Sequence, residues 1–510
     1  MCGIFASNDP KVSFFHEKII DKHLSFRGPD FNSGLIKFGN WKLYHSRLSI
    51  IAPSKKYSQP YHCDDGSVLL YNGEIFNFQK IAEKLKSKTI SDTDLLSKII
   101  INKNFNPNVL DGFFSIVRIS KEGNLLNCIR DPFGVKPLYY FKRGNFITLS
   151  SEPSVIVKIF NPKLSQVSIK EYKIFRYPIF SGSYFNGINP VDPGSCLINK
   201  KYFDAITIIR KSRTSKRNNL FSIIKTVLNE RRLSDVPVGL LLSSGVDSNI
   251  IRNMSNRFKK YFCGGFKNDT DVVFCKKLKK ENKLPIEIVS IQANQFVKKF
   301  KELIKLRCEP LSVPNEVVLS LIAKKAKKNG IKVLISGEGA DEFFAGYDRI
   351  FRWAKNTRVF DIKKFCSLYC YSKVDKSNLK KIKNFFAKIN DLSNINKVKV
   401  FFIKFHLPIL LRRLDFSLMS SGVEGREPFV SKKIFYESLK FSKSQLIDDN
   451  HGKKPLRKIL NRYMNNQFVY EKKIGFPVDM NRIFKIPKKD KINESYKIWF
   501  KKNLEEIKKL

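Results

Sequence analysis

Cys2 is the first residue that could do chemistry, because removal of the initiator Met would make it the N-terminal residue. A thiol and a free α-amine would then belong to one residue. An α-amine with an unperturbed pKa near ~8 can act as a base at neutral pH, so this pair needs no histidine. By position alone, a small residue that happens to follow Met is the simpler interpretation, and the surrounding sequence has to decide.

Residues that could serve such a nucleophile follow along the chain. Asn72 and Gly73 come after the apolar run 68–71 and could donate an amide N–H and a backbone N–H to a tetrahedral oxyanion. Arg47 lies in an alternating strand and could hold an α-carboxylate, and Asp92 could meet an α-ammonium group. Each also has a plainer interpretation: a hairpin turn for Asn72-Gly73, an exposed charge on a strand for Arg47, and a helix N-cap for Asp92.

Two loops in the second half of the chain combine small residues with carboxylates. The run 240–242 leads into Ser243-Ser244-Gly245-Val246-Asp247-Ser248, where backbone N–H groups ahead of a helix suit a phosphate. The run 332–335 leads into Ser336-Gly337-Glu338-Gly339-Ala340-Asp341, whose glycines let a ligand approach the backbone. Asp247 and Asp341 could share one Mg²⁺. An ordinary strand-to-helix turn is the plainer interpretation of either loop alone.

Alternating strands and helices would position these two loops. Strands are expected near 240–242, 261–263, 286–289 and 332–335, and helices at 220–233, at 317–327 and from Asn249 onward. This alternation predicts a parallel α/β sheet with ligands at the carboxyl ends of its strands. The polar segment 211–219 is interpreted as a linker. Residues 356–399 are rich in Lys and Asn, show no chemistry and are expected to form peripheral helices.

The motifs of the first part continue with Leu110-Asp111-Gly112-Phe113-Phe114, the segment 130–140 and Ser150-Ser151-Glu152. With Cys2, Arg47, Asn72-Gly73-Glu74 and Asp92, in this order, they resemble the class II glutamine amidotransferase domain. The resemblance implies a domain at 2–205 with the α+β fold of N-terminal-nucleophile hydrolases, in which stacked antiparallel sheets lie between helices. It implies that Cys2 attacks the glutamine side-chain amide and that Asn72 and Gly73 form the oxyanion hole. The implied glutamine-binding residues are Arg47, Leu48, Ser49, Ile50, Ile51, Asn72, Gly73, Glu74 and Asp92.

The second part is similar to two related families. The loop at 243–248 resembles the pyrophosphate loop of ATP pyrophosphatases, and 336–347 resembles a segment of glutamine-dependent asparagine synthetases. Later segments also resemble that family. They are Leu407-Pro408, Asp415, Met419, the run 424–429, Lys453-Lys454-Pro455-Leu456-Arg457 and Lys473-Ile474-Gly475-Phe476-Pro477. The resemblance implies a domain at 215–510 with an α/β parallel sheet of the ATP-pyrophosphatase type and a helical C-terminal part.

What this resemblance implies is a two-site ligase with Mg²⁺ and the substrates glutamine, aspartate and ATP. The aspartate β-carboxylate is adenylated, and ammonia made at Cys2 crosses an internal tunnel to attack the acyl-adenylate. Glu338 and Lys473 would take part in catalysis, and Asp247 and Asp341 would bind the metal. The implied ATP-binding residues are Leu241, Ser243, Ser244, Gly245, Val246, Asp247, Ser248, Gly264, Ser336 and Gly337.

Two departures from the family pattern and several alternatives stay open. Ser244 replaces the usual first Gly of the loop, and Gly264 stands where an apolar residue often contacts adenine. The same chemistry on another carboxylate, such as a uronic acid of a surface polysaccharide, fits the motifs equally. A β-lactam-forming enzyme is disfavoured because the glutaminase residues look intact. A binding protein with an inactive synthetase site is the alternative from a different class.

Composition narrows the class of protein. The 510 residues contain no run of about 18 apolar residues, so no transmembrane helix is expected, and the N-terminus lacks the pattern of a secretory signal. Nine Cys, an odd number without a CxxC pair, favour a reducing cytoplasm and no zinc site. The net charge of +49 is spread along the chain and mostly Lys, so nucleic-acid binding is disfavoured. The sequence leaves a homodimer open.

Overall fold

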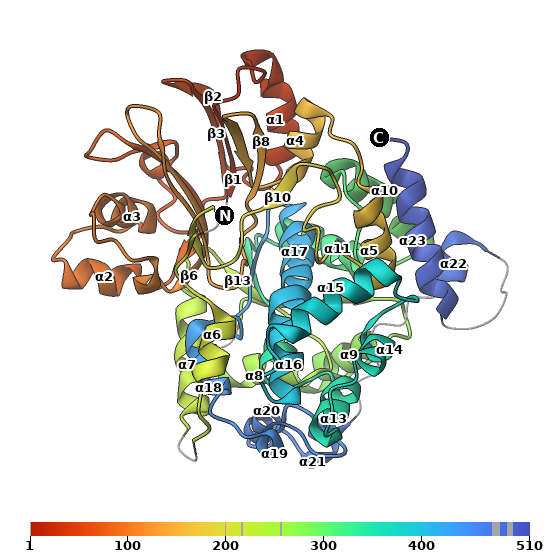
Figure 1. Ribbon diagram of the computed structural model, residues 1–510. Helices are drawn as coiled ribbons and strands as arrows, with labels where there is room; N and C mark the ends of the chain where they lie inside the picture. The colour runs from red at the N-terminus through yellow and green to blue at the C-terminus, as the bar shows by residue number, and fades with distance from the viewer. Residues whose placement is uncertain (1, 199, 216–217, 256–257, 472–479, 487–492) are drawn as a thin grey trace.

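The computed structural model describes residues 2–198, 200–215, 218–255, 258–471, 480–486 and 493–510, and Figure 1 shows its course. Its first part contains two stacked antiparallel sheets. The larger has the strand order β10-β8-β9-β1-β3-β2, and the smaller has the order β4-β5-β6-β7. The strands are β1 (Cys2–Ser7), β2 (Phe31–Phe38), β3 (Trp41–Arg47), β4 (Tyr61–His62), β5 (Val68–Ile75), β6 (Gly112–Ile119), β7 (Leu125–Arg130), β8 (Tyr139–Arg143), β9 (Phe146–Ser150) and β10 (Ile188–Pro190).

The central strand β1 shows why the sheets stack. All six of its residues are buried, because alternate side chains point to opposite faces of a sheet and both faces are covered. Ile4 and Ala6 belong to the core between the two sheets, whereas Phe5 packs with residues of α1 (Glu17–Leu24) and α4 (Pro153–Phe160) on the outer face. α2 (Phe78–Lys84) and α3 (Asp92–Ile100) cover the smaller sheet. The expected sandwich of stacked antiparallel sheets between helices is confirmed.

One local expectation for this part is wrong. Asn72 and Gly73 do not lie in a hairpin turn, because β5 continues to Ile75 and pairs along its length with β6. Gly73 pairs with Phe114 at φ +154°. A Cβ at Gly73 would lie 2.0 Å from the carbonyl oxygen of Phe113, so only glycine fits this strand position.

The second part is built on a parallel sheet with the strand order β15-β14-β13-β16-β17 among the described residues. These strands are β13 (Val238–Leu241), β14 (Lys260–Gly265), β15 (Ile286–Ser290), β16 (Val333–Ile335) and β17 (Glu424–Arg426), and neighbouring strands pair in parallel. The order reverses at β13, which lies between β14 and β16. Loops that follow β13 and β16 therefore meet at a topological switch point, where open α/β sheets bind ligands.

Helices cover this sheet and form the C-terminal part, which confirms the expected α/β class. Around the sheet lie α7 (Leu220–Arg231), α8 (Val246–Met254), α9 (Thr270–Asn282), α10 (Ala293–Arg307) and α11 (Asn315–Lys328). The remaining helices are α5 (Gln166–Phe175), α6 (Ala205–Lys211), α12 (Ala340–Phe343), α13 (Asp348–Asn356), α14 (Ile362–Tyr369), α15 (Lys376–Ala387), α16 (Asn394–Phe401), α17 (Leu407–Met419), α18 (Lys432–Ser438), α19 (Lys443–Leu446), α20 (Lys454–Leu460), α21 (Asn466–Tyr470), α22 (Met480–Phe484) and α23 (Asn493–Ile507). α8 begins at Val246, earlier than the expected start at Asn249, and so includes Asp247 in its first turn.

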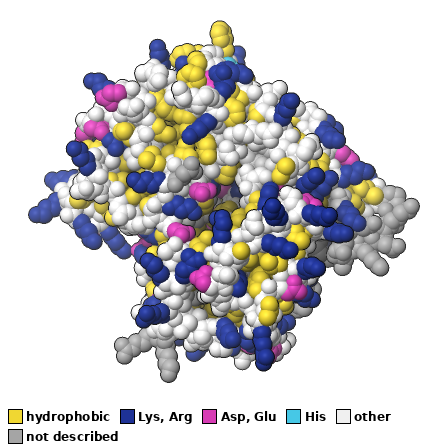
Figure 2. All heavy atoms as spheres, in the orientation of Figure 1, with side chains coloured by type: hydrophobic (Ala, Val, Ile, Leu, Met, Phe, Trp, Pro, Cys, Tyr) yellow, Lys and Arg dark blue, Asp and Glu magenta, His cyan; other side chains and the backbone are white. Residues whose placement is uncertain are grey.

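The basic residues are spread over the surface, as they are spread along the sequence. Figure 2 shows Lys and Arg side chains scattered over the whole visible face rather than gathered in one patch. In the described part of the chain, no helix is both long enough and apolar enough to cross a membrane.

Buried ion pairs join the two parts of the molecule. Arg27 is completely buried, and its Nη1 lies 2.6 Å from Oε1 of Glu152 and 2.8 Å from Oδ2 of Asp415 on α17. Arg412, also on α17, lies 2.6 Å from Oε2 of Glu152 and 3.3 Å from Oε2 of Glu309. Because charges without water need partners, this network fixes α17 against the first part of the chain.

We expect Arg27→Met to destabilise the protein by about 3–5 kcal/mol in urea denaturation, because Glu152 and Asp415 would keep their burial and lose their shared cation. Arg210→Met is the control. Nε of Arg210 lies 2.7 Å from Oδ2 of Asp391, but both side chains are exposed (43% and 47%). The urea midpoint of this variant should therefore match that of the wild type. Equal midpoints for Arg27→Met and the wild type would contradict a structural role for the buried network.

Candidate active sites

The first candidate site surrounds Cys2. Its backbone N donates a 2.9 Å hydrogen bond to Oδ1 of Asn72, and this N is the atom that removal of the initiator Met would free as an α-amine. Burial raises the pKa of the Cys2 thiol, and the Leu48 amide opposes this effect. The thiol is therefore neutral in this environment and needs a base to become a nucleophile. The amine of the same residue is placed to be that base.

The surroundings of Asn72 suit a developing negative charge. Its Nδ2 is buried and has no hydrogen-bond partner in the structure, although its Oδ1 is held by Cys2. Gly73 follows in a strand conformation that a side chain would prevent. An unpartnered buried N–H donor beside a thiol is the arrangement that an oxyanion hole requires.

Arg47 holds the loop that follows it in the chain. Its guanidinium donates to three backbone carbonyls of the following loop, at 2.5 Å to Ser54, 2.7 Å to Ala52 and 3.2 Å to Ile51. In this structure it fixes the shape of the loop 48–54. Direct contact between Arg47 and a ligand carboxylate stays a prediction. The other side of the loop is held by Ser49 N, which donates to Asp30 at 2.7 Å, while Leu48, Ile50 and Ile51 are buried.

Two buried carboxylates face the same region. Burial, together with the charges of Asp92 and Glu424, raises the pKa of Glu74 to about 8. Burial also raises the pKa of Asp92, which accepts hydrogen bonds from the Tyr71 hydroxyl at 2.8 Å and from Ile75 N at 3.2 Å. Nη2 of Arg426 lies 3.7 Å from Oε1 of Glu74. A pair of poorly compensated carboxylates is suited to bind the ammonium group of a ligand.

The second candidate site lies at the switch point of the parallel sheet. Ser248, in the first turn of α8, donates from Oγ to the carbonyl of Ser243 at 3.0 Å. Asn249 holds the same carbonyl at 3.0 Å and that of Gly245 at 2.9 Å. Gly245 is the N-cap of α8, so the loop 243–248 is tied to a helix N-terminus, where an anion is stabilised.

Asp247 and Asp341 are brought together by a cation from the chain itself. Lys453 Nζ lies 2.6 Å from Oδ2 of Asp247 and 2.8 Å from Oδ1 of Asp341. Two glycines leave room for these carboxylates. A Cβ at Gly337 would lie 2.7 Å from the Cβ of Asp247, and a Cβ at Gly346 would lie 1.9 Å from Oδ1 of Asp341. The two loops that follow β13 and β16 therefore form one site.

The donor set fits a divalent cation in part. Two carboxylates that already share one positive charge have the oxygen chemistry that Mg²⁺ prefers, and Mg²⁺ is commonly held by one or two carboxylates with substrate phosphates. Within the ranges that the structure describes, no group of three or more His, Cys, Asp and Glu side chains is arranged around a metal position. Asp247 and Asp341 are thus the residues that would hold Mg²⁺ here.

Ser244, the unusual residue of the loop, has a clear partner. Its backbone N and its Oγ both donate to Oδ1 of Asp271, at 2.8 and 2.7 Å. Asp271 lies in the first turn of α9, so the loop is anchored to the helix that follows β14. A glycine at this position would keep the backbone hydrogen bond and lose the second one.

The remaining predicted residues have mixed placements. Glu338 forms an ion pair with Arg413 of α17, and Ser336 N donates to the Arg426 carbonyl at 2.8 Å. Leu241 ends β13. Gly264 lies in β14, where a Cβ would come within 2.7 Å of Ile322 on α11, so close packing of the helix explains the glycine. Its predicted contact with adenine is untested, and Lys473 lies outside the described residues.

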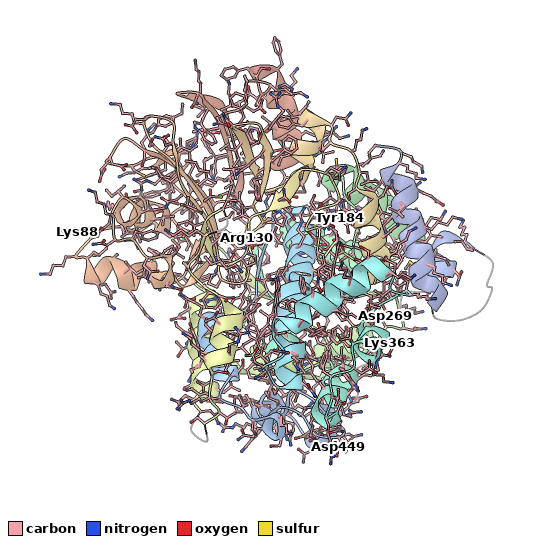
Figure 3. All side chains as sticks on the ribbon, viewed as in Figure 1. Lys88, Arg130, Tyr184, Asp269, Lys363 and Asp449 are labelled. Carbon is pink, nitrogen blue, oxygen red and sulfur yellow. The ribbon has the colours of Figure 1, made fainter. Side chains whose placement is uncertain are left out.

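A cavity of about 1220 Å³ opens beside the loop 243–248. Its lining includes Asp247, Asp341, Lys453, Arg352 and Trp353. Asp449, labelled at the lower end of the molecule in Figure 3, also belongs to the lining. Lys364 and Leu368 line it from α14, so the segment 356–399 is helical as expected, but the expectation that it is peripheral is wrong.

The sequence missed several residues of these sites. Lys453 belongs to a recognised motif, but nothing in its local spacing shows that it reaches both Asp247 and Asp341. Asp271, Arg413 and Arg426 were missed for the same reason, since each acts on a residue that is distant in the chain. Only Asp271 could have been found from local sequence, because it is a carboxylate in the first turn of the helix that follows β14.

Comparisons with known proteins were made for both parts of the chain. The asparagine synthase family model matches residues 222–504, and a glutamine amidotransferase domain model matches residues 1–206. An asparagine synthetase [glutamine-hydrolyzing] of Bacillus subtilis is 29% identical over 395 residues, which cover 71% of this chain and 61% of that protein. An asparagine synthetase [glutamine-hydrolyzing] of Asparagus officinalis is 26% identical over 378 residues, covering 68% and 60%. The chain thus spans about three fifths of the length of these relatives.

Among solved structures, a glutamine phosphoribosylpyrophosphate amidotransferase from B. subtilis matches with a TM-score of 0.28 at 12% identity, covering 66% of this chain and 81% of that one. A TM-score of this size does not define a fold. The fold described above therefore rests on the strands and helices of this chain.

We expect Glu74→Gln to make stability less sensitive to pH. The pKa of Glu74 is about 8 in the folded protein and near ~4.3 in an unfolded chain, so the folded state binds the extra proton between these values. Wild-type stability therefore falls as pH rises through this window, and the variant lacks that fall. The measurement is the free energy of unfolding at pH 5 and pH 8. The value for the variant minus the value for the wild type should be larger at pH 8 than at pH 5, by about 1 kcal/mol or more.

Glu83→Gln provides the control, because this exposed residue lies on the nearby helix α2. Its difference from the wild type should be the same at both pH values. An equal difference at both pH values for Glu74→Gln would show that this carboxyl is ionised in the folded protein.

Proposed function

Because the chain belongs to the asparagine synthase family and carries a glutamine amidotransferase domain ahead of that match, we propose that it is a glutamine-hydrolysing asparagine synthetase. It would use ATP to activate the β-carboxylate of aspartate and ammonia from glutamine to form the amide. The observation that carries this proposal is the pairing of Asp247 and Asp341 at the end of a loop tied to a helix N-terminus, in one chain with a buried Cys2 beside Asn72. We infer a cytoplasmic setting, where glutamine and ATP are supplied.

Glutamine hydrolysis follows from the surroundings of Cys2. The α-amine accepts the thiol proton, the thiolate attacks the glutamine side-chain carbonyl, and Asn72 Nδ2 with Gly73 N stabilises the oxyanion. The α-ammonium group gives its proton to the departing nitrogen, so collapse of the tetrahedral intermediate releases ammonia, and water then hydrolyses the thioester to glutamate and the free thiol. Glu74 and Asp92 would bind the α-ammonium group, whose positive charge offsets the repulsion between the two buried carboxylates.

Amide synthesis would take place at the switch point. The loop 243–248 binds the β- and γ-phosphates of ATP, the acceptor carboxylate attacks the α-phosphorus, and pyrophosphate leaves. Ammonia then attacks the acyl carbon of the acyl-adenylate, and AMP leaves. Mg²⁺ held by Asp247 and Asp341 would supply positive charge to the phosphates. Lys453 must release these carboxylates at that stage, and its ammonium group is then free to contact a phosphate.

Two parts of this reaction follow from the family rather than from a contact in the structure. Ammonia would pass from Cys2 to the acyl-adenylate through an internal tunnel, since ammonium formed in water is not a nucleophile. Glu338 would assist its attack, and Lys473 would stabilise developing negative charge. A uronic acid is the alternative acceptor, and the cavity of about 1220 Å³ beside the loop has room for a carboxylic acid larger than aspartate.

The test supplies glutamine, Mg-ATP and a panel of carboxylic acids that includes aspartate and D-glucuronate, and it measures AMP, pyrophosphate and amide. Formation of AMP and asparagine with aspartate alone would support the proposal. Hydrolysis of glutamine without AMP formation from aspartate would show that the acceptor is another acid. Absence of pyrophosphate with every acceptor would favour a binding protein with an inactive synthetase site.

We expect Cys2→Ala to abolish glutamine-dependent synthesis, by at least about 10³-fold, because no other nucleophile is available to the glutamine amide. Ammonia-dependent synthesis at the second site should be unchanged, since that site does not use the thiol. The matched control is Cys128→Ala, another buried thiol of the same core, which should keep both activities. Loss of both activities in Cys2→Ala would contradict the two-site reaction.

We expect Asp271→Ala to raise the KM for ATP about tenfold or more, because the loop would lose both hydrogen bonds from Ser244. Ser244→Gly keeps the backbone bond and should cost less, about twofold to threefold. Glu281→Ala on the same helix is exposed and serves as the control. An unchanged KM in Asp271→Ala would show that this contact does not shape the loop for ATP.

A further inference from the structure

A smaller cavity of about 380 Å³ lies next to the site at the switch point. Its wall combines Arg349 of α13, Arg413 of α17 and Arg176, the residue that ends α5. Tyr347, Tyr371 and His406 add polar and aromatic surface. Arg176 is the contribution of the first part of the chain, so the cavity exists only when the two parts are packed together.

Arg176 lacks the partner that a guanidinium in such a place requires. Its Nε is buried without a hydrogen-bond partner, and among the described residues no carboxylate forms an ion pair with it. Its charge lies over the Tyr371 ring, 4.3 Å from the centroid, which holds the side chain in one orientation. The side chain as a whole is only partly buried, so the unpartnered atom is Nε, and an anionic ligand would give it an acceptor.

The other polar groups of the cavity do not neutralise this charge. His406 contacts the Tyr369 hydroxyl at 3.1 Å and the Tyr347 hydroxyl at 3.0 Å, and Tyr347 in turn donates to Glu342 at 2.6 Å. Asp348 is the one carboxylate among the lining residues, and its Oδ1 accepts from Gly452 N at 2.9 Å. Arg413 is already paired with Glu338, so Arg176 and Arg349 are the two arginines of this wall without an ion pair among the described residues, and the cavity is suited to an anion.

The cavity shares a wall with the candidate site at the switch point. Tyr347, Asp348 and Arg349 line both this cavity and the larger one that contains Asp247 and Asp341. Arg413 lines the small cavity and forms an ion pair with Glu338. Arg413 therefore stands between Glu338 and the small cavity that Arg176 lines.

We propose that this cavity binds the carboxylic acid acceptor and that Arg176 binds a second anionic group of it, remote from the carboxylate that is activated. The proposal rests on the proposed ATP-dependent amidation and names its substrate class: an acid with a second carboxylate or a phosphate. Aspartate, through its α-carboxylate, and a sugar acid that carries a phosphate share this chemistry. An acid with one anionic group leaves Arg176 without a partner.

The experiment measures AMP formation with ammonia, Mg-ATP and four acceptors: aspartate, β-alanine, D-glucuronate 1-phosphate and D-glucuronate. Each pair differs in the second anionic group. The wild type should use one dianionic member with a KM at least about tenfold below that of its partner. Arg176→Gln should raise that KM about tenfold or more at nearly unchanged kcat, Arg176→Lys should recover part of the loss, and the singly charged partner should be unaffected.

Lys173→Gln is the matched control, because Lys173 is an exposed cation on the same helix α5. It should leave every KM unchanged, and equal melting temperatures would show that all variants fold. A KM for the dianionic acceptor that is the same in Arg176→Gln and the wild type would overturn the proposal. The response to each acceptor pair decides whether the second group is a carboxylate or a phosphate.

A failure of the proposed function is distinguishable from a failure of this inference. If the wild type forms AMP with none of the four acceptors, the amidation assignment fails. The anion site is then judged by thermal shift with the same four acids. Stabilisation by a dianionic acid that Arg176→Gln loses and Lys173→Gln retains supports the site, and equal shifts in all three proteins overturn it.

Discussion

The fully buried guanidinium of Arg27 is the interaction on which the two-part architecture depends. It donates to the Cys2 carbonyl oxygen at 3.1 Å, and it pairs with Glu152 from its own part of the chain and with Asp415 from the other. Lys136 lies 3.9 Å from both Asp415 and Glu424 and extends the network to β17. Loss of one cation from this network while the two parts stay packed would leave carboxylates buried without a partner, which costs far more than the pairs themselves contribute.

Helix α17 turns this constraint into a link between the two candidate sites. It carries Arg412 and Asp415, which hold the first part of the chain, and Arg413, which pairs with Glu338. The short strand β17 acts in the same way, because Arg426 reaches Glu74 while its carbonyl holds Ser336. Residues that fix one site therefore lie next to residues that fix the other. The distance between the two sites is therefore set by packing.

The sequence predicts local motifs well and long-range partners poorly. The sandwich, the parallel sheet and the loops 243–248 and 336–341 follow from spacing and resemblance, because strand–turn–helix chemistry is local. The role of Lys453 could not be predicted, since its ammonium reaches Asp247 only after α20 packs against α8. The contacts of Arg47 with the carbonyls at 51–54 could not be predicted either, since these groups become acceptors only when the loop folds back. Ser244, a departure from the pattern, is explained by Asp271 on a neighbouring helix.

The two sites compensate the negative charge of their paired carboxylates in different ways. At the switch point, Lys453 neutralises Asp247 and Asp341, so a cation that enters must exchange with a side chain the protein already supplies. Beside Cys2 no lysine reaches the acids among the described residues, and Glu74, with its pKa raised to about 8, keeps its proton instead. An ammonium group that entered this site would therefore take the place of a proton. Both sites thus exchange one positive charge for another: a lysine side chain at the partly exposed Asp247 and Asp341, and a proton at the buried Glu74.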